Sequence, residues 1–136
     1  MIKPYKISVP KSTLNNIYKK VRAYPWKMMQ NVNGWEYGTN YNYLKKISKY
    51  WVSKYNWKKF ENKINSFKNY KTNVDGINLH FIIEKSKNPK SRPLLLLHGW
   101  PGSVIEFFDI IPRLAHPEQF GGKIEDGFDV IVPSLP

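Results

Sequence analysis

The chain has 136 residues and a formal net charge of +12, with 41% hydrophobic and 15% aromatic residues. This length corresponds to about one small domain on the usual scale of roughly 100–200 residues per domain, and the apolar content is too high for a disordered chain. The absence of cysteine excludes disulfides, thiolate-held metals and thiol nucleophiles. The longest aliphatic run, Leu94–Leu97, is too short to span a membrane. Residues 1–10 lack the apolar segment of a secretory signal, so we expect a cytoplasmic protein.

The positive charge is concentrated in residues 1–90, which hold 19 basic and 4 acidic residues. Lysine supplies 19 of the 22 cations, whereas recognition of phosphates and bases favours arginine. We therefore favour a solvated lysine surface and expect no nucleic-acid partner. The alternative is a basic nucleic-acid-binding protein, whose affinity would fall steeply with salt.

Three helices are expected in the first half of the chain. Apolar residues recur with helical spacing after Pro10, and Pro25 ends that pattern. Residues 26–39, which contain Asn33–Gly34, are aperiodic and indicate an ordered loop. Thr39 or Asn40 can cap a second helix that runs to about Lys54. The side chains of this helix expected to face a core are Tyr43, Leu44, Ile47, Tyr50, Trp51 and Tyr55.

A third, shorter helix is expected over residues 57–67, and the apolar period then changes to two. Two alternating segments flank Asp75–Gly76, a strong signal for a β-hairpin. The aromatic residues between positions 18 and 70 fall at helical spacing, which favours core packing over a base-stacking surface.

The last third of the sequence predicts a strand, a helix and a second strand. Leu94–Leu97 is continuously apolar, as expected of a strand that is buried on both faces. A helix over Ser103–Ala115 would begin with a capping box of Ser103 and Glu106, and Pro112 should kink it or end it early. Phe128–Val132 supplies the second strand. This succession predicts a parallel crossover unit and an α/β fold class.

The turn after the leucine run is the most informative segment, with the sequence His98-Gly99-Trp100-Pro101-Gly102. Ligand sites of open α/β sheets lie at the carboxyl ends of strands. Backbone amides in a tight turn there can stabilise a developing oxyanion. No Gly-Lys-Ser/Thr follows, which excludes a phosphate-binding loop. The alternative is an ordinary strand–turn–helix corner in which His98 is purely structural.

The same segment resembles the oxyanion-hole motif of epoxide hydrolases with the α/β-hydrolase fold. The segments Gly34–Gly38, Asp75–Gly76 and Pro133–Pro136 resemble corresponding parts of the microsomal-type subfamily. Tyr24-Pro25-Trp26 departs from the Arg-Trp-Pro that is usual there, so the resemblance does not predict the conformation of this turn.

The resemblance implies a helical meander over residues 1–68, followed over residues 69–136 by the first strands of an incomplete α/β-hydrolase sheet, a hairpin and one βαβ unit. It implies hydrolysis of a small-molecule epoxide to a vicinal diol through an aspartyl ester, without metal or cofactor. It assigns an oxyanion-binding backbone N–H to Trp100. The residues that shape the turn would be His98, Gly99, Pro101 and Gly102, and a cis bond is expected between Trp100 and Pro101.

The resemblance also implies that the nucleophile, the acid, the catalytic histidine and the lid tyrosines lie beyond Pro136. Asp109, Asp126 and Asp129 are not on a Gly-X-Asp-X-Gly elbow, and His116 is not in the position of the base. We therefore expect a fragment without turnover. The alternative is a non-catalytic half-domain that pairs with a second chain carrying the C-terminal half.

Overall fold

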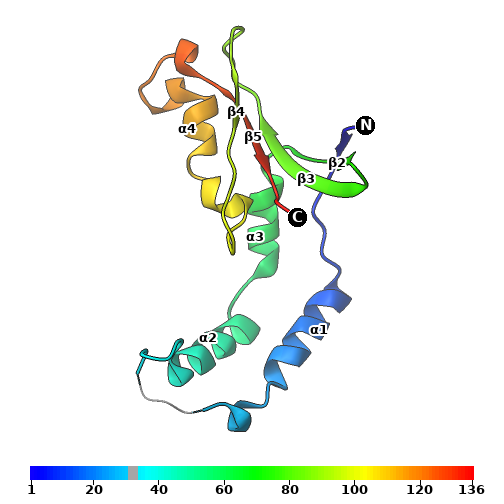
Figure 1. Ribbon diagram of the computed structural model, residues 1–136, viewed down its shortest axis with the longest axis vertical. Helices are drawn as coiled ribbons and strands as arrows, with labels where there is room; N and C mark the ends of the chain where they lie inside the picture. The colour runs from blue at the N-terminus through cyan, green and yellow to red at the C-terminus, as the bar shows by residue number, and fades with distance from the viewer. Residues whose placement is uncertain (31–33) are drawn as a thin grey trace. The chain divides into compact units, whose positions relative to one another are not determined.

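The structure is a computed structural model that describes residues 1–30 and 34–136. The chain divides into two compact units, one formed by Ser8–Lys59 and the other by Met1–Ile7 together with Phe60–Pro136 (Figure 1). Part of the ordered loop predicted over residues 26–39, including Asn33, lies outside the described residues. The domain boundary at residue 68 stays a prediction.

The unit Ser8–Lys59 is built around two helices, α1 (Lys11–Arg22) and α2 (Tyr41–Ser53), with a short 3₁₀ turn at Trp26–Met28 between them. The side chain of Asn40 accepts a hydrogen bond from the Tyr43 N–H at 3.0 Å, which confirms the predicted helix cap. α1 ends at Arg22, ahead of Pro25, as its sequence predicts.

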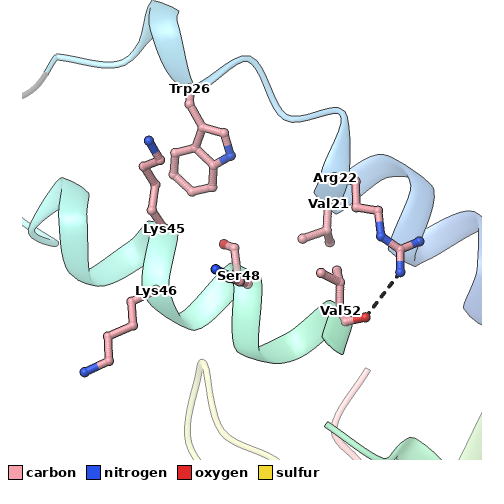
Figure 2. A pocket seen from close by; sticks show the side chains of 8 residues that line it. Val21, Arg22, Trp26, Lys45, Lys46, Ser48 and Val52 are labelled. Atoms are coloured by element: carbon pink, nitrogen blue, oxygen red, sulfur yellow. Dashed lines mark hydrogen bonds between the residues drawn. The ribbon is translucent and has the colours of Figure 1, made fainter. Parts of the chain in front are cut away.

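The apolar side of α2 is the first point of difference from expectation. Val21 of α1 points toward Val52 of α2, and Val52 is half-buried (Figure 2). Four side chains of α2 that were expected in a core are 41–50% exposed, namely Tyr43, Ile47, Tyr50 and Trp51. The prediction that these four residues are buried is wrong for the described residues, because α2 offers more apolar surface than its contact with α1 covers.

The second unit contains a five-stranded sheet with the order β1-β2-β3-β5-β4. The hairpin strands are β2 (Asn69–Val74) and β3 (Ile77–Glu84), and β5 (Asp129–Pro133) pairs with β3 antiparallel and with β4 (Pro93–Leu95) in parallel. Figure 1 shows β5, in red, between its two neighbours. The predicted hairpin and parallel crossover unit are confirmed.

The hairpin turn and one further strand complete the sheet. Asp75 and Gly76 both have positive φ, 49° and 85°, as a two-residue turn matched to strand twist requires. β1 (Lys3–Pro4) adds antiparallel to β2. This two-residue strand was not predicted, because a pair of residues has no measurable period.

One face of the sheet carries the main core. Val130 and Val132 alternate along β5, and Ile82 of β3 lies opposite Val132, so these three side chains share a face. All three are fully buried, together with Ile111 and Ala115 of the short helix α4 (Ile111–Ala115). α3 (Trp57–Asn65) contributes the buried Ile64. α4 and α3 are the helices that lie nearest the sheet in Figure 1.

The leucine run does not have two buried faces, contrary to prediction. Leu94 lies opposite Val130 and is half-buried, whereas Leu95 and Leu97 point to the other face and are 57% and 56% exposed. β4 is the last strand in the order of the described sheet, so its side chains have a neighbouring strand on one side only. Its pairing with β5 extends one residue further, since the Leu96 N–H donates to the Ile131 carbonyl at 2.9 Å.

The predicted helix over Ser103–Ala115 is two separate pieces. A 3₁₀ turn covers Val104–Phe107, and α4 begins only at Ile111. Pro112 occupies the first turn of α4, where a missing N–H costs no hydrogen bond, so it begins a helix instead of ending one. The capping box is present: the Glu106 carboxylate accepts from the Ser103 N–H at 3.2 Å, and the Ser103 hydroxyl oxygen accepts from the Ile105 N–H at 3.4 Å.

None of the helices in the described residues is long and apolar enough to cross a membrane.

We predict that the 136-residue chain associates more strongly as the salt concentration rises. β4 presents an unpaired ladder edge beside exposed Leu95, and pairing of edges is opposed here by charge repulsion that salt screens within about 8 Å at physiological ionic strength. Sedimentation velocity at low and high salt measures the effect. Leu95→Lys should reduce association, whereas the matched control Val74→Lys, at an exposed hairpin end, should not. A monomer at both salt concentrations would contradict the prediction.

Candidate functional site

The candidate site is the turn at the carboxyl end of β4, from His98 to Gly102. The peptide bond between Trp100 and Pro101 is cis, as predicted. The turn closes through a hydrogen bond from the Gly102 N–H to the Gly99 carbonyl at 2.7 Å. The 3₁₀ turn capped by Ser103 begins immediately afterwards, so the candidate residues lie in a short segment held at both ends.

The His98 ring contacts two backbone groups. Its Nδ1 lies 3.0 Å from the Gly99 carbonyl oxygen, and its Nε2 accepts from the Leu135 N–H at 3.1 Å. A backbone N–H can only donate, so Nε2 carries no proton and Nδ1–H donates to Gly99. His98 therefore has no free nitrogen with which to act as a general base, and its contacts are structural.

The Trp100 backbone N–H makes no hydrogen bond within the part of the chain that the structure describes. The Trp100 side chain is 97% exposed. An unpaired amide in a tight turn at the end of a parallel strand is a donor that an oxyanion can use. The assignment of an oxyanion-binding role to Trp100 stays a prediction.

The two glycines of the turn differ in their surroundings. A Cβ added to Gly102 would overlap the Glu106 carboxylate and lie 2.7 Å from the Gly99 carbonyl oxygen. A Cβ added to Gly99 meets nothing within 4 Å. Close packing therefore requires glycine at position 102 in this structure, but does not require it at position 99.

Asp109, His116 and Asp129, which the sequence left outside the site, each have another partner. Asp109 is 97% exposed and lies 3.8 Å from the Lys63 ammonium. His116 Nε2 lies 2.9 Å from a Glu84 carboxylate oxygen. Asp129 accepts from the Ser86 N–H and the Ser91 hydroxyl, which anchors the loop before β4.

The hydrogen bond from Lys85 is the largest cause that lowers the pKa of Asp129 below its usual value. Within residues 1–30 and 34–136, no group of three or more histidine, aspartate or glutamate side chains is arranged to hold a metal ion.

A second histidine network was not found from the sequence. His80 of β3 contacts Ser134, just after β5, through Nδ1 at 2.8 Å and contacts Asn69 through Nε2 at 3.0 Å. Burial lowers the pKa of His80 below its usual value of 6.5, and the positive charge of Lys71 lowers it further. The sequence does not indicate this network, because a histidine in a strand of alternating polarity has the pattern of any half-exposed polar residue.

A separate groove lies between α1 and α2 in the unit Ser8–Lys59, with a volume of about 470 Å³. Figure 2 shows Trp26 and Val21 on its walls with Lys45 beside the indole. Its lining residues are apolar or cationic apart from the hydroxyl of Ser48, and they include no carboxylate. It has no acid–base pair that could support catalysis.

Comparison with known proteins shows the family of the chain. The chain belongs to the epoxide hydrolase N terminus family, whose sequence model matches residues 2–107. A protein of Stigmatella aurantiaca (strain DW4/3-1), provisionally named as an epoxide hydrolase, is 44% identical over 135 residues, which cover 99% of this chain and 31% of that protein. Epoxide hydrolase 1 of Oryctolagus cuniculus is 37% identical over 141 residues, covering 99% of this chain and 30% of the relative.

The fold is shared with a solved member. The crystal structure of juvenile hormone epoxide hydrolase from the silkworm Bombyx mori superimposes with a TM-score of 0.84 at 33% identity, over 100% of this chain and 32% of that one. The helices and mixed sheet thus correspond to the N-terminal part of an α/β-hydrolase structure. The chain spans about a third of the length of the relatives that it matches.

We predict that Gly102→Ala destabilises the chain by roughly 1–3 kcal/mol, the usual cost of forcing an extra methyl group into a packed position. The added Cβ displaces the Gly99 carbonyl or the Glu106 carboxylate, and the second movement opens the capping box. Urea unfolding at low salt measures the change. Gly99→Ala is the matched control and should cost less, since its Cβ points into open space. Equal effects of the two variants would show that close packing at Gly102 is not the cause.

We also predict that the free energy of unfolding decreases as the pH falls below about 6.5. In the unfolded chain His80 regains its usual pKa of 6.5, while its folded pKa is lower. The unfolded state therefore binds more protons at acidic pH, and stability falls with falling pH. Unfolding titrations from pH 7 to pH 5 should show a shallower slope for His80→Gln than for the unaltered chain. His116→Gln, the control, should leave the His80 contribution in place.

Proposed function

We propose that this chain supplies one oxyanion-binding donor of an epoxide hydrolase, the backbone N–H of Trp100. The observation that carries the proposal is that this amide has no hydrogen-bond partner among the described residues and lies at the carboxyl end of a parallel strand. Membership of the family and the silkworm structure support the reaction class. The substrate class is a small-molecule epoxide.

In the proposed mechanism an aspartate attacks an epoxide carbon, the C–O bond breaks, the released oxygen takes a proton from a lid tyrosine, and an ester to the enzyme forms. A histidine then removes a proton from water, which attacks the ester carbonyl. The acyl–oxygen bond breaks, the vicinal diol leaves with the carboxyl proton, and the histidine returns its proton to the tyrosine. The negative oxygen formed in that second step accepts a hydrogen bond from the Trp100 N–H. His98, Gly99, Pro101 and Gly102 shape the turn that presents this donor.

The reacting carboxylate and the base are proposed to come from the remaining part of the enzyme. None of the described acidic residues belongs to the turn itself. Glu106 beside it accepts from the Ser103 N–H, Asp129 is bound to the loop before β4, and Asp109 faces solvent beside Lys63. In this proposal residues 1–68 form the helical meander and residues 69–136 the start of the catalytic core. No cofactor or metal takes part.

We predict negligible epoxide hydrolysis by residues 1–136 alone. Loss of one member of a nucleophile–base unit typically lowers turnover by about 10⁴-fold or more, and here both members are proposed to be absent. Diol formation from styrene oxide is measured against a blank without protein. Turnover above the blank that disappears in Trp100→Pro, which removes the N–H, would overturn the inactive-fragment proposal while supporting the role of Trp100.

A further inference from the structure

The segment at the end of β5 has few backbone N–H groups that can donate hydrogen bonds. The last four residues are Pro133, Ser134, Leu135 and Pro136, and proline has no backbone N–H. Ser134 and Leu135 therefore carry the only backbone N–H donors of this segment. The Ser134 N–H donates to the His80 carbonyl at 2.8 Å, and the Leu135 N–H donates to His98 Nε2 at 3.1 Å. Both backbone N–H groups thus donate to an atom of a histidine residue.

The His80 side chain adds a second hold on Ser134. Asn69 donates through Nδ2 to the Ile64 and Phe67 carbonyls, at 3.0 and 2.8 Å. This orientation leaves its Oδ1 as the acceptor that faces His80 Nε2. His80 therefore carries its proton on Nε2, and its Nδ1 accepts from the Ser134 hydroxyl at 2.8 Å.

The two histidines act from opposite sides of β5. His80 is on β3 and His98 follows β4, and these strands are the two neighbours of β5 in the sheet. Each ring is held by a second contact, His80 by Asn69 and His98 by the Gly99 carbonyl. The segment Ser134–Leu135 is consequently held between two oriented rings at the point where the strand ladder stops.

We propose that His80 and His98 are positioning residues that form a clamp on Ser134–Leu135 and hold this segment in register with the oxyanion turn. The link to the turn is direct, because the His98 ring bonds Leu135 through one nitrogen and Gly99, next to Trp100, through the other. A shift of the segment after β5 would therefore pull on the residue that precedes the Trp100 amide. The role in catalysis rests on the proposed function, whereas the clamp itself does not.

Three substitutions at position 98 separate the contacts. In His98→Gln the side-chain amide oxygen can replace Nε2 as the acceptor for the Leu135 N–H. His98→Asn retains only a donor near the Gly99 carbonyl. His98→Phe keeps a ring that makes neither hydrogen bond. Ser134→Ala is the matched control on the neighbouring residue, since it removes the contact to the His80 ring and keeps both backbone donors.

The experiment is NMR on the full 136-residue chain at low salt. Long-range ¹H–¹⁵N spectra should show the Nδ1–H tautomer for His98 and the Nε2–H tautomer for His80. Amide exchange of Leu135 should rise about tenfold in His98→Phe and His98→Asn, the effect of losing one hydrogen bond. It should stay near the unaltered rate in His98→Gln and in Ser134→Ala. The Trp100 amide resonance should move in the variants that release Leu135.

Three results would overturn the clamp: an Nε2–H tautomer for His98 in the unaltered chain, unchanged Leu135 exchange in His98→Phe, or a Trp100 amide that does not respond when Leu135 is released. The tautomer is read without any substitution, so a variant that fails to fold leaves the test intact. None of these readouts involves turnover. Failure of the oxyanion proposal would appear in epoxide hydrolysis, and failure of the clamp in tautomer and exchange.

Discussion

The parallel ladder between β4 and β5 is the contact on which the rest of the site depends. Parallel strands end at the same edge of a sheet, so this pairing brings the turn after β4 and the segment after β5 together. The ladder itself stops near Leu96, whose N–H donates to Ile131. Beyond that point the Ser134 N–H still donates to the backbone carbonyl of His80, whereas the Leu135 N–H donates to the His98 ring.

Near β4 and β5, the side chains on one face of the sheet are buried and those of β4 on the other face are exposed. Val130 and Val132 are fully buried under α4, while Leu95 and Leu97 remain exposed on the opposite face of the edge strand. A continuous run of leucine is suited to burial on both faces. The mismatch between the sequence of β4 and its exposure agrees with the finding that the chain spans about a third of its relatives.

Neutral histidine is a requirement of the arrangement rather than an incidental state. His98 Nε2 can accept from Leu135 only without a proton, and the desolvation of His80 favours its uncharged form. Lys71 adds to this effect, and its ammonium lies 3.7 Å from the centre of the Tyr5 ring. Lys71 is thus a charged residue that helps to keep His80 in its uncharged form.

Local signals in the sequence determined most elements of this protein. The Asn40 cap, the Asp75–Gly76 turn and the Ser103–Glu106 capping box each involve residues close in the chain, so their hydrogen bonds follow from spacing alone. Only tertiary structure decided which leucines of β4 are covered and that His80 meets Ser134 across 54 residues. Those outcomes depend on which strands become neighbours, and periodicity carries no information about that choice.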